Sequence, residues 1–142
     1  MKHLAVIPAR KGSVGLPYKN RMFFDTTANF IDTLPWFDEV IVTTDDPIVK
    51  GKAQSRGYRI HNRPKSLAGP AVSIKAVFKD LMDSLKLNLE EILWLFYLPN
   101  LYYNRIHFEE ARVRIENEKK DSLCSFIKAS SHPFYCWRYN EE

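Results

Sequence analysis

Residues 4–20 form the stretch LAVIPARKGSVGLPYKN, which combines a strand and a polar loop near the start of the chain. The run Leu4–Ile7 is short and continuously apolar, as expected for a strand that is buried on both faces of a sheet. The run ends at Pro8, and a loop containing Gly12 and Gly15 follows. A strand of this kind favours a parallel sheet covered by helices on both faces.

The alternation of strand and helix continues along the chain. Residues 40–44 (VIVTT) are β-branched throughout and predict a second strand. Asp46 before Pro47 predicts the N-cap of a helix that runs to about Gly57. The further elements expected are a short strand at 58–60, a helix at 71–87, a central strand at 91–98, a helix with the apolar stripe Phe108, Ala111 and Ile115, and a last strand at 121–129.

This pattern predicts an α/β fold with a three-layer, Rossmann-like and mostly parallel sheet. The chain has 142 residues, which corresponds to one domain at roughly 100–200 residues per domain, so residues 1–142 are expected to form a single domain. In such sheets ligands bind beyond the carboxyl ends of the strands. The loops after Ile7, Thr44 and Leu98 are therefore the expected binding region.

Composition excludes several classes of protein. The net charge of +4 comes from 21 Lys and Arg against 17 Asp and Glu, and so mild an excess gives no support to nucleic-acid binding. No stretch approaches the ~20 apolar residues of a membrane span, and the apolar run at 4–7 is too short for a signal peptide. Two cysteines, Cys124 and Cys136, favour reduced thiols in a cytoplasmic protein, with Cys124 predicted in the core.

The charge is unevenly distributed, because the first 24 residues contain five Lys and Arg and no acidic residue. In the loop at 8–20, glycines allow a close backbone approach to an anion, and Arg10 and Lys19 supply charge. Ser13 and Asn20 add neutral hydrogen bonds. The loop suits a polyphosphate, although it is neither a Walker A loop nor a dinucleotide fingerprint. The alternative is a solvated surface loop.

The string IPARKGSVGLPYKN at 7–20 closely resembles the opening signature of the acylneuraminate cytidylyltransferases, the CMP-sialic acid synthetases. The resemblance continues in further segments: FDEVIVTTDD at 37–46, Gly57-Tyr58, Asn62-Arg63-Pro64, Leu67-Ala68, Ser73-Ile74, and Asp121-Ser122 through His132-Pro133 to Trp137. It implies a nucleotide-diphospho-sugar transferase-like fold. It also implies a cytoplasmic, homodimeric, Mg²⁺-dependent nucleotidyltransferase that transfers CMP from CTP to a sugar acid and releases pyrophosphate.

The resemblance also implies roles for individual residues. Arg10 and Lys19 are expected to act in catalysis by contacting the CTP phosphates. The nucleotide-binding residues implied are Ala9, Arg10, Gly12, Ser13, Asn20, Arg63 and Ser73. The metal ligands are unknown. Asp45 is a weak candidate, and the alternative for Asp45-Asp46 is a strand end with a helix N-cap.

Departures from the family pattern favour a second hypothesis. Val14 stands where the family usually has Lys, and Leu98 stands where it has a Gln that is expected to touch the sugar. The first helix, expected at 23–36 and broken by Pro35, is shorter than in the family, and the chain ends at Glu142 before the family's metal-binding carboxylates. The alternatives are a catalytically impaired nucleotide-binding module of the same fold, or a truncated chain.

Three tyrosines lie close together after the strand expected at 91–98: Tyr97, Tyr102 and Tyr103. They are expected either to stack on a base or to pack against a helix or second subunit.

Overall fold

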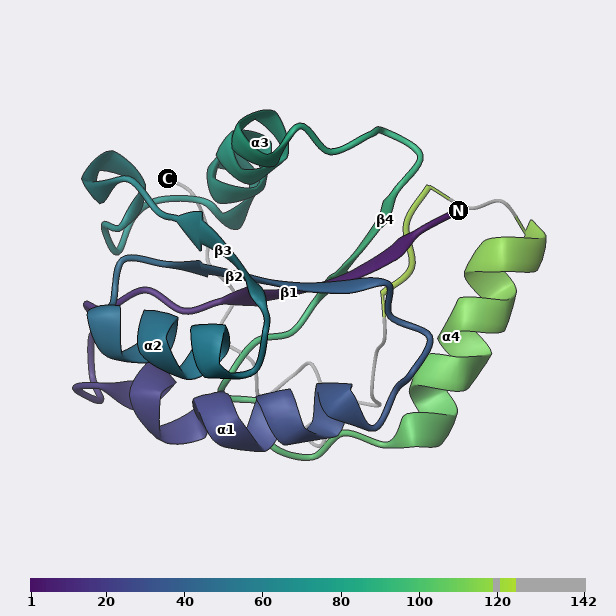
Figure 1. Ribbon diagram of the computed structural model, residues 1–142, viewed down its shortest axis with the longest axis horizontal. Coiled ribbons are helices and arrows are strands. Elements are labelled where there is room, and N and C mark those ends of the chain that lie inside the picture. Colours follow the sequence, from purple (N-terminus) through teal and green to yellow (C-terminus); the bar gives the residue numbers. More distant parts are fainter. Residues whose placement is uncertain (119–120, 125–142) are drawn as a thin grey trace, which may run out of the picture. The chain divides into compact units, whose positions relative to one another are not determined.

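The computed structural model describes residues 1–118 and 121–124, in two compact units, Met1–Tyr103 and Asn104–Glu142 (Figure 1). The elements of the first unit are β1 (His3–Pro8), α1 (Lys19–Asp32), β2 (Glu39–Thr44), α2 (Pro47–Ser55), β3 (Arg59–Asn62), a 3-10 turn (Lys65–Leu67), α3 (Ile74–Leu85) and β4 (Ile92–Leu95). The described part of the second unit contains α4 (Arg105–Glu118), the helix expected to carry the stripe at Phe108. The single domain over 1–142 stays a prediction.

The sheet of the first unit has the strand order β3-β2-β1-β4, and each neighbouring pair is parallel. The predicted parallel α/β sheet is therefore confirmed. The strand predicted as central is shorter than expected and lies, as β4, at one end of this order among the described strands. Its apolar character has another cause, because Trp94 packs in a cluster of rings with His3, Trp36 and Phe37.

Helices cover both faces of the sheet (Figure 1), with α1 and α2 on one face and α3 on the other. On the α3 face, Leu4 and Val6 of β1 pack with Leu81 of α3. The intervening residues Ala5 and Ile7 are also fully buried. Since alternate side chains of a strand point to opposite faces, β1 is buried on both of its faces, as its apolar run predicts.

The ends of the first two helices can be compared with the helix ends predicted from the sequence. Asp46 caps α2 by accepting the N–H of Ile48 at 2.9 Å, and Gly57 follows the end of this helix with a φ of 74°. Both predictions are confirmed. The first helix begins earlier than predicted, at Lys19, because Tyr18 adopts a left-handed conformation with a φ of 57° that turns the chain into α1. Lys19 and Asn20 therefore belong to its first turn rather than to the loop.

The end of the chain is described only in part. Residues 121–124 are not in a strand, and the remainder of the expected strand at 121–129 lies outside the described residues. Cys124 is exposed, so its predicted place in the core is wrong. Cys136, His132-Pro133 and Trp137 lie outside the described residues. Within residues 1–118 and 121–124, no helix has the length and apolar character needed to cross a bilayer.

Candidate functional site

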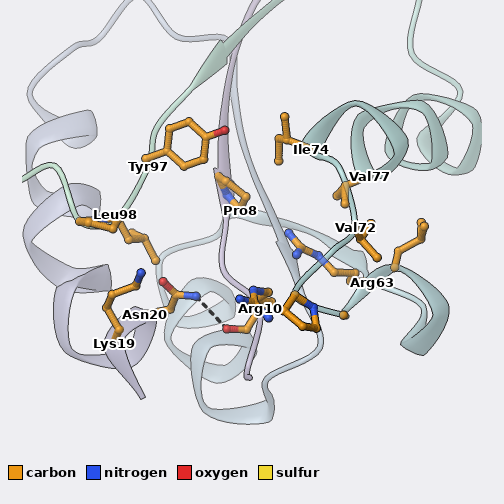
Figure 2. Close-up of a pocket in the computed structure, with 14 residues that line it drawn as sticks. Pro8, Arg10, Lys19, Asn20, Arg63, Val72, Ile74, Val77, Tyr97 and Leu98 are labelled. Atoms are coloured by element: carbon orange, nitrogen blue, oxygen red, sulfur yellow. Dashed lines mark hydrogen bonds between the residues drawn. The ribbon is translucent and has the colours of Figure 1, made fainter. Parts of the chain in front are cut away.

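A pocket of about 310 Å³ opens at the carboxyl end of the sheet (Figure 2). Its polar side chains come from two directions: Lys19 and Asn20 approach from α1 and Arg63 from the segment after β3, with Arg10 between them. The loops after β1, β3 and β4 all contribute to it. The pocket lies at the end of the sheet that the general rule for parallel sheets indicates. Of the three loops predicted to form it, those after β1 and β4 contribute, whereas Asp45 in the loop after Thr44 lines a different hollow, and the segment after β3 was not predicted.

The opposite wall of the pocket is apolar. It consists of side chains from the start of α3 and from the segment after β4: Val72, Ile74, Val77, Tyr97, Leu98 and Pro99. Leu98 is buried to 1% exposure, and its side chain has no hydrogen-bonding atom. The pocket thus combines a cationic side, suited to phosphates, with an apolar side, suited to the flat face of a ring.

Backbone and side-chain hydrogen bonds hold the β1 loop in place. The backbone N–H of Ala9 donates to the carbonyl of Thr43 at 3.0 Å, and the Thr44 hydroxyl donates to the carbonyl of Ala9 at 2.6 Å. Asn20 Nδ2 donates to the carbonyl of Arg10 at 2.7 Å (Figure 2). A cationic loop held in this way needs little reorganisation when it binds an anion.

The N-terminus of α1 adds positive potential beside Lys19. Tyr18, at the N-cap position, makes no side-chain hydrogen bond to the helix, and the first turn contains no acidic residue. The N-terminus of a helix carries a partial positive charge that attracts anions, although at α1 the N–H groups of Lys19 and Arg21 already donate to the carbonyls of Leu16 and Tyr18. The start of α3 differs, because the Ser73 hydroxyl caps it by accepting the N–H of Ala76 at 3.2 Å.

A partly buried ion pair ties α1 to the N-terminus of α2. Arg21 Nε donates to Asp46 Oδ2 at 2.7 Å, and the Arg21 guanidinium lies 4.3 Å from the centre of the Tyr18 ring. Burial raises the pKa of Asp46, but the hydrogen bonds from Arg21 and from the Ile48 backbone outweigh it, so the pKa lies below its usual value. The carboxylate therefore stays ionised, and it holds Arg21 of α1 against the capped start of α2.

Arg63 is a cation with only 8% of its surface exposed. Its Nη2 donates to the carbonyl of Thr43 at 3.2 Å and its Nε to the Thr43 hydroxyl at 3.3 Å. Burial lowers its pKa, the charge of Asp45 opposes that effect, and the nearby Arg10 adds to it. Two arginines close enough to repel one another are stabilised by an anion placed between them.

The predicted site residues fall into three groups. Arg10, Lys19, Asn20 and Arg63 line the pocket together. Gly12, Ser13 and Asp45 line a second hollow of about 380 Å³. Ala9 and Ser73 line neither of these hollows: Ala9 is fully buried and bonds to β2, and Ser73 caps α3.

The tyrosines after β4 separate into different environments. Tyr97 lines the pocket and is half-exposed, as a residue that stacks on a base requires. The Tyr103 ring stacks on Phe30 of α1 at 4.9 Å between centres, which is the packing alternative. Sequence reasoning did not identify Val72, Ile74 and Val77 as pocket residues. Ile74 and Val77 have the spacing of an apolar helix face, which indicates packing rather than ligand binding.

The residues described at 1–118 and 121–124 contain no cluster of three or more candidate metal ligands. No three Asp, Glu, His or Cys side chains in this part of the chain come together as metal ligands would. Asp45 Oδ1 accepts the backbone N–H of Lys11 at 2.7 Å, so it also holds the loop. Magnesium, which takes an octahedron of oxygen ligands, stays an expectation of the resemblance.

Comparison with known proteins supports the sequence resemblance. The chain is 27% identical over 141 residues to an N-acylneuraminate cytidylyltransferase of Streptococcus agalactiae serotype V (strain ATCC BAA-611 / 2603 V/R), a match that covers 94% of this chain and 34% of the relative. The protein of the same name from S. agalactiae serotype III (strain NEM316) matches with the same identity and coverage. The chain thus spans about a third of the length of these curated relatives. No protein-family model matches the sequence.

The fold is similar to that of a solved CMP:2-keto-3-deoxy-manno-octonic acid synthetase complexed with CTP. The TM-score is 0.65 at 21% identity, over 84% of this chain and 49% of that chain. The likeness confirms the predicted α/β fold, which this chain shares with the synthetase over the matched residues. Together with the curated relatives, it confirms the resemblance first indicated by residues 7–20.

Proposed function

We propose that this chain, a divergent relative of the N-acylneuraminate cytidylyltransferases, binds CTP and transfers CMP to a sugar acid with release of pyrophosphate. The observation that carries the proposal is the convergence of Arg10, Lys19 and Arg63 with the N-terminus of α1 on one pocket. The curated relatives support the reaction class.

In the proposed reaction a hydroxyl oxygen of the sugar acid attacks the α-phosphorus of CTP. The new P–O bond forms as the bond from the α-phosphorus to the bridging oxygen of the β-phosphate breaks, so the electron pair leaves with pyrophosphate and the hydroxyl proton passes to water. Arg10 and Lys19 balance the charge that develops on the phosphate oxygens. Catalysis then depends on positioning and electrostatics, which a loop held by Ala9 and Asn20 provides.

The apolar wall is assigned to the cytosine ring and the sugar. Tyr97 offers an exposed aromatic face on which a base can stack, and Val72 and Ile74 lie on the side of the pocket where α3 begins. The proposal includes a cytoplasmic location, consistent with the exposed thiol of Cys124, and a homodimer. Mg²⁺ belongs to the proposal as well, and no step is assigned to it.

Pyrophosphate release from CTP in the presence of a panel of sugar acids tests the proposal. We expect release with at least one acid, and a fall of about 10²-fold or more in kcat/KM for Arg10→Ala, because one charge-stabilising contact in phosphoryl transfer contributes roughly that much. Lys79→Ala, an exposed cation of α3, is the matched control and should behave as the wild type. Absence of release with every acid by the folded chain contradicts the transferase proposal.

The second candidate function is a catalytically impaired nucleotide-binding module. The observations that favour it are Val14, which is 75% exposed where a cation would face the phosphates, and Leu98, which cannot hydrogen-bond a sugar. This alternative predicts that calorimetry detects CTP binding that Arg10→Ala abolishes, without turnover. Absence of any CTP binding contradicts both functions.

A further inference from the structure

A chain of polar side chains connects the surface of α3 to the pocket. His61 on β3 and Thr43 on β2 lie opposite each other in the parallel register of these strands. His61 Nδ1 is 2.8 Å from the Thr43 hydroxyl oxygen, and His61 Nε2 is 2.9 Å from Asp80 Oδ2. The same Thr43 oxygen accepts the Nε–H of Arg63 at 3.3 Å. This series of hydrogen bonds therefore ends at Arg63, a cation that lines the pocket.

The chemistry of the groups allows one direction for these hydrogen bonds. Asp80 can only accept, so Nε2 of His61 carries the proton. Burial lowers the pKa of His61, Asp80 opposes that effect and Arg63 adds to it, so the imidazole is neutral and its Nδ1 accepts. Thr43 must then donate to Nδ1, which leaves its oxygen free to accept from Arg63, a group that can only donate.

Because these side chains are buried, losing one of the hydrogen bonds between them would cost free energy. Thr43 is fully buried, and His61 and Arg63 are 2% and 8% exposed. A buried polar atom that loses its partner cannot turn to water instead. The side chain of Asp80 is partly exposed, so the acidic residue of this hydrogen-bonded series is accessible to solvent.

We propose that Asp80, His61 and Thr43 are positioning residues that hold the Arg63 guanidinium at the orientation in which it contacts CTP. The inference deepens the proposed function and rests on it. The Nε and Nη2 of Arg63 both donate to Thr43, and Arg63 lines the pocket, so the guanidinium N–H groups that do not donate to Thr43 are those available to a bound nucleotide. Preorganising the cation removes the cost of ordering it when the nucleotide binds.

CTP affinity in two backgrounds tests the proposal. Thr43→Val keeps the shape of the side chain and removes the hydroxyl, so we expect the Kd for CTP to rise about tenfold, the size of one hydrogen bond to a charged group. In an Arg63→Ala background the same substitution should change the Kd by less than about twofold, since no guanidinium remains to be positioned. Thr43→Ser, which retains the hydroxyl, should recover most of the affinity.

Variants at the exposed end of the chain avoid the risk of unfolding. Asp80→Leu should weaken CTP binding about as much as Thr43→Val, whereas Asp80→Asn, whose amide oxygen can still accept from Nε2, should weaken it less. Asp83→Leu removes the same charge from α3 at an exposed position and is the matched control. Wild-type affinity in Asp80→Leu, or an equal loss in the presence and absence of Arg63, overturns the proposal.

A measurement without CTP separates this inference from the proposed function. The Arg63 Nε–H should exchange slowly with solvent in the wild type and about tenfold or more faster in Thr43→Val and Asp80→Leu, and ¹⁵N spectra should show His61 protonated at Nε2. If the wild type binds no CTP, the proposed function fails. Unchanged exchange in the two variants overturns the positioning chain whether or not CTP binds.

Discussion

Leu98 shows how one residue limits what the pocket can recognise. It lies beside Tyr97 and Pro99 in the pocket wall and is almost completely buried. A hydrocarbon side chain at this point can pack against a ring face or a methyl group and offers no hydrogen bond to a hydroxyl group placed against it. The proposed specificity of the pocket therefore depends on what Leu98 excludes as much as on what Arg10 attracts.

Leu98→Gln is expected to destabilise the fold, because it places an amide in a wall that offers it few partners. We expect the free energy of unfolding in urea to fall by about 1–3 kcal/mol, the usual range for a buried polar group without full hydrogen bonding. Leu98→Met keeps the volume and should cost less than about 1.5 kcal/mol. Equal stability of the two variants contradicts the interpretation that Leu98 faces an apolar wall.

At the scale of secondary structure, the elements predicted correctly are those with local signals. The β-branched run at 40–44 and the Asp46-Pro47 pair required no knowledge of the rest of the chain. The start of α1 was missed because the left-handed turn at Tyr18 is not encoded by a glycine or an asparagine. The place of β4 was missed because strand order is set by packing between distant segments, here the rings around Trp94.

The residues of the candidate site also divide into those predicted from local sequence and those that only the fold brings together. Arg10 and Lys19 were predicted because they occupy one short loop, and Arg63 because its Arg-Pro segment resembles that of a known family. The residues that hold Arg63 were missed, since Thr43 and His61 are 18 residues apart and His61 and Asp80 are 19 apart. Only the parallel register of β2 and β3 brings them together.

Removing the cap of α2 should destabilise the fold. Asp46→Ala loses the hydrogen bond to Ile48 and leaves Arg21 without its carboxylate, so we expect a loss of about 2 kcal/mol or more in the free energy of unfolding. Asp46→Asn retains an oxygen that can cap the helix and should lose less. Urea denaturation of both variants checks this, and an equal loss would show that capping contributes nothing.

At the scale of the whole molecule, His61 couples stability to pH. Burial holds the pKa of His61 below its usual 6.5 in the fold, with Asp80 opposing this and Arg63 adding to it, whereas the unfolded chain has the usual value. Between these two pKa values the unfolded state binds more protons, so stability rises with pH through that window. The contribution is complete above about pH 6.5 and is lost as the pH falls toward the pKa of the folded state.

We therefore expect the urea concentration at the unfolding midpoint of the wild type to decrease when the pH is lowered from 7.5 to 5.5. His61→Gln removes the titrating group, so its midpoint, although lower at pH 7.5, should change less over the same range. The carboxylates whose pKa is lowered, Asp25 and Asp46, act only below their usual 3.8 and do not contribute in this window. An equal pH dependence in the wild type and in His61→Gln would show that another group is responsible and that folding does not lower the pKa of His61.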